Sequence, residues 1–385
     1  MKRLSCQNRK AHYIIMNVYI LLTTYIFLVW LLTKKGRIVY TISELNIISV
    51  NAFMMLSFVA CFLISSLRGK FVGKDTISYI RYYKEVGQLT WSGLREGLWD
   101  NNYFTTEKGF MILEKILSDI SIPSQLFISI CSLFFIYGVY KFSCKYVKES
   151  VLVSIFTFLA MGGYLASMNV MRQGIGVGLC CLAWVRLKEE NYKRFVLDVI
   201  IASTFHISCC VFLGAVFLKK IPASKKNILF LMIGFITFGI FGVALMPFVL
   251  SFVPTYAFRY GRGRWDWGQA NGVIIVWIII ILVMLLMTFK KDWSDEKNHI
   301  DFEIMILALC YVSINMIGLV FDGAQRLSLL FQPFLILLFD RSCGLWEKKT
   351  KYIYKFCVIT CMFVFFYKAS STEQYIYMPY WVHGG

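Results

Sequence analysis

Long apolar runs, separated by short polar segments rich in lysine and arginine, dominate the chain. A helix needs about 20 consecutive apolar residues to cross a bilayer, and several runs reach that length. Because a segment in lipid must satisfy its own backbone hydrogen bonds, the runs are predicted to be helices. They cover residues 13–32, 46–67, 124–142, 151–169, 170–187, 227–252, 271–289, 302–321, 327–340 and 352–367. The pattern predicts an all-α polytopic membrane protein with about ten transmembrane helices, forming a single integral membrane domain over residues 1–385.

Residues 68–123 form the longest polar segment, and we expect this segment on the extracytoplasmic side. Within it, the apolar residues between Met111 and Ile120 recur at helical spacing, at positions 112, 113, 116, 117 and 120. This pattern is typical of a short amphipathic helix that lies in the plane of the membrane interface.

Residues 195–218 are one span long, but basic clusters flank them on both sides. Lysine and arginine concentrate in cytoplasmic loops. A re-entrant hairpin that returns to the cytoplasmic side leaves more than half of the 40 lysines and arginines in cytoplasmic loops, and a full crossing leaves fewer. We therefore predict a hairpin with His206 near its tip and both chain ends outside.

Composition agrees with a membrane protein, since 58% of the residues are hydrophobic and 16% are charged. The net charge of +18 is explained by basic cytoplasmic loops that attract anionic lipid. No basic run is interleaved with aromatic residues in a soluble domain, so nucleic acid is not an expected partner. The 12 cysteines form no CxxC motif, the four histidines are scattered, and no phosphate-binding loop or dinucleotide fingerprint occurs. No metal or cofactor is expected.

Arg172 and Gln173 stand side by side within apolar sequence. A charge at the bilayer centre costs roughly 2.5–3.5 kcal/mol on insertion scales, so such a residue usually faces water, a partner or an anionic ligand. The alternative is that Arg172 reaches from a helix end to the interface. Gly174 and Gly178 form a pair of small residues that lets another helix approach closely.

Charged residues far apart in the sequence converge on the extracytoplasmic face in this topology. They are Arg68, Asp75, Glu107, Arg172, Arg259, Arg262, Arg264 and Arg326, with His206 near the hairpin tip. Arginine offers planar, bidentate contacts to phosphate oxygens, so this cavity suits a substrate that carries phosphate. Nearby aromatic residues such as Tyr79 could stack on sugar faces, or could belong to the ordinary aromatic belt of the interface.

Several short motifs occur in an order and spacing that point to one family. They are Arg68 followed by Val72-Gly73-Lys74-Asp75 and Tyr79, Glu107-Lys108-Gly109-Phe110, Met171-Arg172-Gln173, Phe205-His206-Ile207-Ser208, Gln325-Arg326 and Tyr377-Met378-Pro379-Tyr380. With these motifs the chain resembles the EpsG-type family of bacterial membrane polysaccharide polymerases, which are Wzy-like in role. Lys74 departs from the family, where a small hydroxyl residue is more common before the aspartate.

The resemblance implies a polymerase of the bacterial cytoplasmic (inner) membrane. It would join oligosaccharide repeat units carried on undecaprenyl diphosphate into O-antigen, capsular or exopolysaccharide, beside a flippase and a chain-length regulator. The substrate-binding residues would then be Arg68, Tyr79, Arg172, Gln173, Arg259 and Arg326. A lipid-linked oligosaccharide flippase or other transporter and a membrane O-acyltransferase are the alternatives.

Such a reaction needs a base that takes the proton of the attacking hydroxyl. The candidates are His206, Asp75 and Glu107, in that order. Histidine titrates nearest to the working pH and would not compete with the diphosphate for the arginines. Alternatively, His206 is a buried residue bonded to Ser203 or Ser208, and Glu107 favours a helix N-terminus.

Overall fold

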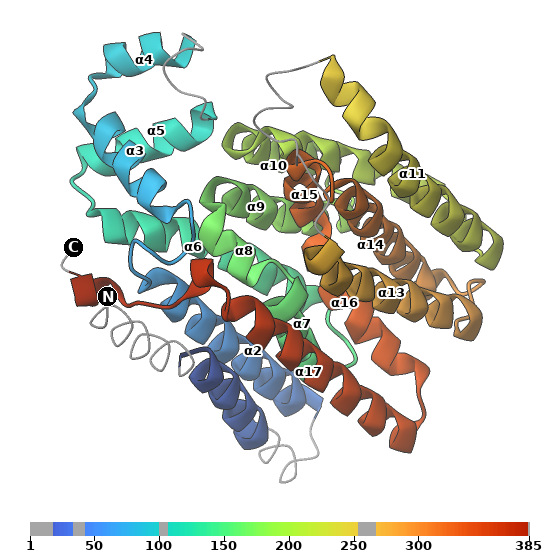
Figure 1. Ribbon diagram of the computed structural model, residues 1–385. Helices are drawn as coiled ribbons and strands as arrows, with labels where there is room; N and C mark the ends of the chain where they lie inside the picture. The colour runs from blue at the N-terminus through green and yellow to red at the C-terminus, as the bar shows by residue number, and fades with distance from the viewer. Residues whose placement is uncertain (1–17, 34–42, 100–106, 253–266, 384–385) are drawn as a thin grey trace. The chain divides into compact units, whose positions relative to one another are not determined.

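The computed structural model describes residues 18–33, 43–99, 107–252 and 267–383, and helices make up most of this part of the chain (Figure 1). Among these residues no strand forms, and an isolated β-bridge joins Arg68 to Pro379. In the same residues, six helices are long and apolar enough to cross a membrane, and three shorter apolar helices accompany them. The predicted all-α polytopic membrane fold is therefore confirmed, whereas the number of crossings stays a prediction.

The chain divides into two compact units. The first consists of Met1–Tyr146, Tyr164–Val211 and Thr360–Gly385, and the second consists of Val147–Gly163 and Phe212–Ile359. The expected extracytoplasmic segment 68–123 lies within the first unit. The membrane side on which this segment lies stays a prediction.

The first unit holds the N-terminal helix, a group of short helices and several longer ones. They are Val18–Thr33, α2 (Ser43–Ser66), α3 (Thr76–Gln88), α4 (Trp91–Trp99), α5 (Lys108–Asp119), α6 (Ser124–Tyr146), α8 (Tyr164–Asn169), α9 (Met171–Lys188), α10 (Tyr192–Phe205), the end of α17 (Lys348–Ser370), and the short η5 (Glu373–Tyr375) and η6 (Tyr380–His383). Helices α3, α4 and α5 lie together at one end of this unit (Figure 1).

Helix α6 is central to the first unit, because it packs against both α2 and α9. The contact with α9 is close at Gly178, where an added Cβ atom would lie 2.4 Å from the carbonyl oxygen of Phe134. The expected close approach at Gly178 is therefore present. Gly174 does not share it, since its nearest neighbour is Ser167 on the preceding segment.

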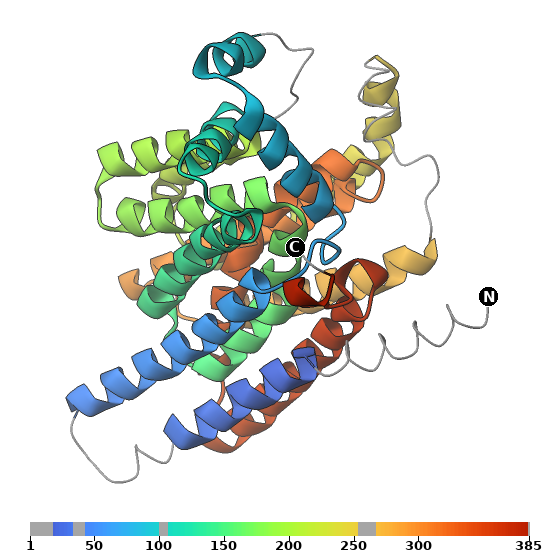
Figure 2. The same ribbon diagram turned by 90° about the vertical axis from the view of Figure 1, so that its left-hand side faces the viewer.

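The C-terminal tail returns to the N-terminal helix and to the end of α2. Figure 2 shows the Val18–Thr33 helix alongside the last turns of α17, where the ring of Tyr19 meets Phe366 at 5.6 Å. The hydroxyl of Tyr377 donates a hydrogen bond to the carbonyl of Ile64 (3.1 Å). The backbone N–H groups of Gly69 and Gly73 donate to carbonyls of the same tail. The tail therefore holds the loop that joins α2 to α3.

The second unit is built mainly from long apolar helices. They are α7 (Val151–Met161), most of η1 (Ile207–Lys220), α11 (Lys225–Ser251), α13 (Trp267–Lys290), η2 (Glu296–Asn298), α14 (His299–Ile317), α15 (Asp322–Ser328), η3 (Leu329–Phe331), α16 (Gln332–Ser342), η4 (Cys343–Leu345) and the start of α17. Helix α16 packs against α7, α13 and α14. Most residues of α14 and α16 are buried, whereas α11 exposes many large apolar side chains, as expected of a lipid-facing helix.

Buried charges in the second unit are paired. Asp340 accepts hydrogen bonds from the backbone N–H groups of Lys148, Glu149 and Ser150, at 2.7–3.0 Å, and so caps the start of α7. Arg341 donates to Asp301 at 2.8 Å. Removing one partner of a buried ion pair costs several kcal/mol, so this network is structural.

The predicted spans and the observed helices differ where the chain bends. The predicted helix 151–169 is broken at Gly162-Gly163, and Gly163 adopts a φ of +87° that favours glycine. The segment 195–218 is not one helix, because α10 ends at Phe205 and the backbone of His206 is extended (φ −156°) before η1 begins. Whether this segment returns to the side from which it came stays a prediction.

Candidate functional site

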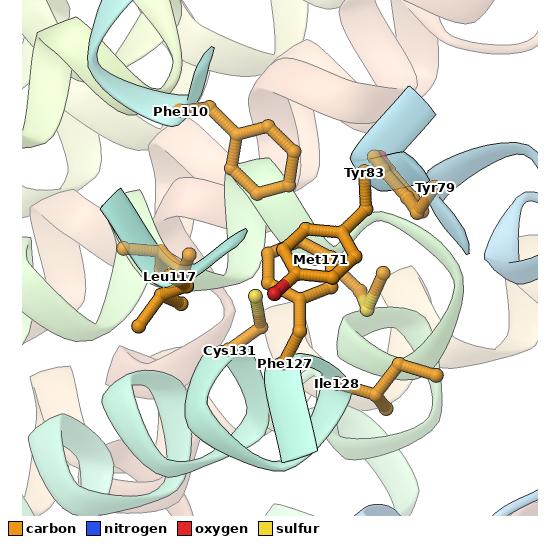
Figure 3. Close-up of a cluster of buried hydrophobic side chains, with 9 residues drawn as sticks. Tyr79, Tyr83, Phe110, Leu117, Phe127, Ile128, Cys131 and Met171 are labelled. Carbon is orange, nitrogen blue, oxygen red and sulfur yellow. The ribbon is translucent and has the colours of Figure 1, made fainter. Parts of the chain in front are cut away.

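A cluster of buried apolar side chains fixes α3, α5, α6 and the start of α9 against one another (Figure 3). The rings of Tyr83 and Phe127 stack with centroids 4.4 Å apart, and Tyr79 meets Phe110 edge to face. Met171, the first residue of α9, belongs to the same cluster. The next residue, Arg172, is therefore held at the edge of a rigid apolar platform.

Glu107 is the residue around which the charged groups gather. It stands just before α5 with an extended backbone, and its side chain makes no capping hydrogen bond to that helix. The carboxylate accepts a hydrogen bond from Nη1 of Arg172 instead. Its other oxygen lies 3.9 Å from Nε2 of His206. Glu107 thus stands at the N-terminus of α5, as the alternative expected, but its carboxylate bonds to Arg172 and not to the helix backbone.

Arg172 lies in the first turn of α9 and faces Glu107 on one side and an aromatic ring on the other. Its guanidinium sits 5.8 Å from the centre of the Tyr79 ring. A cation over an aromatic face gains about 0.5–1 kcal/mol when exposed and more when desolvated. Glu107 and Tyr79 thus hold the arginine in one orientation, and about a quarter of its side chain (23%) stays exposed.

His206 occupies the break between α10 and η1. Its Nδ1 lies 2.6 Å from the hydroxyl of Ser208, and its Nε2 points toward Glu107. One side chain thus orients the ring while a carboxylate stands near the other nitrogen, an arrangement that suits a general base. The imidazole keeps 17% of its side-chain surface exposed.

Gly109 lets α5 come close enough to α10 for this contact. A Cβ atom at this position would lie 2.2 Å from the hydroxyl oxygen of Thr204 and 2.9 Å from its carbonyl oxygen. Real side chains do not tolerate such distances, so any larger residue would push the two helices apart. Glycine here thus sets the separation of Glu107 from His206.

Asp75 precedes the first residue of α3, one helical turn before Tyr79. Its backbone N–H donates to the side chain of Asn169 (3.0 Å), and Gly73, two residues earlier, has a φ of +86° that favours glycine. The carboxyl is half-buried and lies near Tyr375. Among the three candidate bases, the structure brings Glu107 and His206 together.

Arg68 is fully buried, and its guanidinium serves the protein interior. It donates to the hydroxyl of Ser132 at 2.9 Å and to the carbonyl of Met168 at 3.4 Å. It thereby ties the end of α2 to α6 and to the segment before α9. Burial lowers the pKa of Arg68 to about 10. A direct contact with substrate stays a prediction for this residue.

The remaining predicted substrate-binding residues are Gln173, Arg326 and Arg259. Gln173 is buried beside Arg172, at 1% exposure. Arg326 is half-buried on α15 of the second unit, which is braced through Ser328, since Asn315 donates to its hydroxyl (3.0 Å) and accepts from Trp277 (3.1 Å). Arg259 lies outside the described residues, as do Arg262 and Arg264.

Glu114 is a charged residue at this site that the sequence pattern did not single out. The predicted apolar face of the 111–120 helix includes Ile112, Ile116 and Ile120, and the structure leaves all three exposed. It buries a different face, which consists of Phe110, Met111, Glu114, Lys115 and Leu117. The spacing of Glu114 from Glu107, seven residues or about two helical turns, was the available signal.

Comparison with known proteins identifies the chain. The EpsG family matches residues 51–382, and this range contains every residue of the cluster around Glu107. No curated protein and no solved structure matches the chain. Within the described residues, no group of three or more histidine, cysteine, aspartate or glutamate side chains is arranged to hold a metal ion. Since the match covers most of its length, the chain belongs to the EpsG family.

Proposed function

We propose that the protein is a polymerase that joins oligosaccharide repeat units carried on undecaprenyl diphosphate. Membership of the EpsG family supports a role of the polysaccharide-polymerase type in general, and the long apolar helices make the chain a multi-pass membrane protein. The lipid-linked substrate and the outer face of the bacterial cytoplasmic (inner) membrane as the place of reaction are parts of the proposal.

The observation that carries the proposal is the position of Glu107 between Arg172 and His206. The guanidinium of an arginine can hold a diphosphate, and a histidine within reach can take a proton. The carboxylate between them bonds to the arginine, and its negative charge stabilises the imidazolium once it forms. These are the two functions that transfer of a glycan from a lipid diphosphate requires.

In the proposed reaction, a hydroxyl of the acceptor unit attacks the anomeric carbon of the growing chain. A new glycosidic C–O bond forms while the bond from the anomeric carbon to the diphosphate oxygen breaks. The electron pair of that bond leaves with undecaprenyl diphosphate, whose charge Arg172 stabilises. The hydroxyl proton passes to Nε2 of His206, which faces Glu107. The diphosphate ester supplies the energy, so the scheme needs no nucleotide.

Gene deletion with complementation tests this function against a flippase or other transporter. Without a polymerase, surface glycan gels show single capped repeat units, whereas without a flippase they show none. Wild-type protein and the exposed-site control Glu96→Gln should restore the ladder, and Glu107→Gln should not. A strain that lacks even single capped units would overturn the proposal in favour of transport, and a normal ladder after deletion would exclude both roles.

A further inference from the structure

Glu114 is buried inside the apolar platform on which the site is built. Phe110 and Leu117, about one helical turn before and after it on α5, both point into the cluster of Figure 3. Glu114 itself is 1% exposed. Neither of its carboxyl oxygens has a hydrogen-bond partner among the described residues. Burying an ionised carboxylate without hydrogen bonds would cost far more free energy than burying a neutral carboxyl group.

The charged and titratable groups around Glu114 belong to α3, α6, α9 and the end of α10. Arg172 of α9, Tyr83 of α3 and Cys131 of α6 interact electrostatically with it. His206 follows the last residue of α10, and its Nε2 lies 3.9 Å from the carboxylate of Glu107, which precedes α5. Lys115, the neighbour of Glu114 on α5, bonds to Asp119 instead. Arg172 is therefore the cation that responds to the charge of Glu114.

Burial raises the pKa of Glu114 to about 8, although the nearby Arg172 opposes the shift. The carboxyl is then neutral at neutral pH and becomes charged under mildly alkaline conditions. Glu107, with 20% of its side chain exposed, already balances the charge of Arg172 as its direct partner. A second carboxylate at Glu114 would give the three side chains a net negative charge.

We propose that Glu114 is a positioning residue of this site, which stands behind Arg172 as a neutral carboxylic acid and weakens anion binding when it ionises. When Glu114 is protonated, the positive charge of Arg172 attracts a diphosphate. When Glu114 is ionised, its negative charge weakens that attraction. Linkage makes the effect reciprocal, so a bound anion favours proton uptake by Glu114. The proposal rests on the proposed function only in its choice of a lipid diphosphate as the ligand.

Infrared difference spectroscopy tests the protonation state without any substrate. Purified full-length protein in detergent is titrated from about pH 6.5 to about pH 9.5, a range that brackets the expected ionisation. The wild type should lose a carbonyl band of a neutral carboxyl across this range. Glu114→Gln should lack that change, and the exposed-site control Glu96→Gln should keep it. The same spectral change in Glu114→Gln as in the wild type would overturn the proposal.

Binding of undecaprenyl diphosphate in detergent micelles tests the consequence. From about pH 6.5 to about pH 9.5 we expect the affinity of the wild type for undecaprenyl diphosphate to fall about tenfold. One added negative charge near Arg172 changes the binding free energy by roughly the amount that corresponds to this factor. Glu114→Gln should lose at most about half of its affinity. Since every other titratable group is common to the two proteins, the difference between them isolates Glu114. Equal pH dependence in both would overturn the positioning role.

The two measurements separate this proposal from the proposed function. If the wild type binds no undecaprenyl diphosphate at either pH, the proposed substrate is wrong and the positioning role falls with it. The infrared titration then still decides whether Glu114 is neutral. If binding is strong and its pH dependence survives in Glu114→Gln, only the role of Glu114 is wrong.

Discussion

The guanidinium of Arg172 donates a hydrogen bond to the carboxylate of Glu107, although 65 positions separate the two residues along the chain. Arg172 lies in the first turn of a helix inside apolar sequence, and Glu107 directly precedes a short helix of the polar segment 68–123. Each residue on its own has an ordinary explanation, at a membrane interface or at a helix end. Their pairing, with His206 on the other oxygen of the carboxylate, turns separate charges into a site.

Arg172→Lys should lose most polymerisation while the protein is still made and inserted. Lysine is a point charge and cannot serve Glu107 and a phosphate with a planar pair of N–H groups. Loss of one charge-assisted hydrogen bond, roughly 1.5–3 kcal/mol, corresponds to a rate reduction of about 10- to 100-fold. Polymerisation of purified lipid-linked units measures the effect, with Arg81→Lys on the exposed side of α3 as control. A normal glycan ladder would support the alternative that Arg172 only reaches from a helix end to the membrane interface.

Substitutions of the three candidate bases should separate their roles. A general base contributes about 10²- to 10⁴-fold, so His206→Gln should reduce turnover by that order. Glu107→Gln should also impair it, because the amide cannot stabilise the imidazolium. Asp75→Asn, which leaves both Glu107 and His206 unchanged, should have the smallest effect. Single-turnover rates with purified substrate decide the order. If His206→Gln keeps near-normal turnover and Asp75→Asn is inactive, Asp75 is the base.

Gly109→Ala should disturb catalysis by moving α5 away from α10. The added methyl group meets the side chain of Thr204, with an oxygen at 2.2 Å. Overpacking of this kind typically costs about 1–3 kcal/mol and shifts the backbone. Turnover should therefore fall, and the double variant Gly109→Ala/Thr204→Gly should recover part of it. The absence of any recovery, with both single variants well folded, would show that the contact does not set the Glu107–His206 distance.

Arg68→Gln should destabilise the protein more than it changes substrate affinity. The buried guanidinium serves Ser132, Met168 and the end of α2, and an unsatisfied buried polar group costs roughly 1–3 kcal/mol. Thermal unfolding in detergent should show a lower midpoint, while KM for the lipid-linked unit in the folded fraction stays close to the wild-type value. An unchanged midpoint with a raised KM would instead support the predicted substrate contact.

Glu114→Gln should stabilise the protein, increasingly so as pH rises. The ordinary pKa of 4.5 applies to the unfolded chain, and burial raises the folded value to about 8. Between these values the folded state binds more protons than the unfolded state, so wild-type stability falls as pH rises. The two proteins should therefore unfold at similar temperatures near pH 4.5 and diverge up to about pH 8. A pH-independent difference would contradict the buried, neutral carboxyl.

Single cysteines in a cysteine-free background test the predicted hairpin at 195–218. Replacements of Lys220 and Lys225, both exposed, should resist a membrane-impermeant thiol reagent in intact cells if this segment returns to the cytoplasmic side. Glu96→Cys, in the segment expected outside, should react and so serves as the positive control. Labelling of position 220 or 225 from outside would show that the segment crosses the membrane.

The sequence by itself determined that the chain is an all-α membrane protein, and it singled out Arg172, Glu107 and His206. These inferences depend on local properties: the length of an apolar run, the cost of a charge within it, and short motifs. The helix ends of α6, α11 and α17 agree with the predicted runs to within a few residues for the same reason.

Only the tertiary structure decided which of these residues meet and which face of α5 is buried. That helix has apolar residues on more than one side, so its own periodicity does not choose between them. Packing of α3, α6 and α9 against it buries Glu114 and leaves Ile112, Ile116 and Ile120 exposed. Likewise, Arg68 and Arg172 carry equal charge in the sequence. Arg68 is buried and bonds to Ser132 and Met168 in the protein interior. Arg172 bonds to Glu107 and keeps part of its side chain exposed.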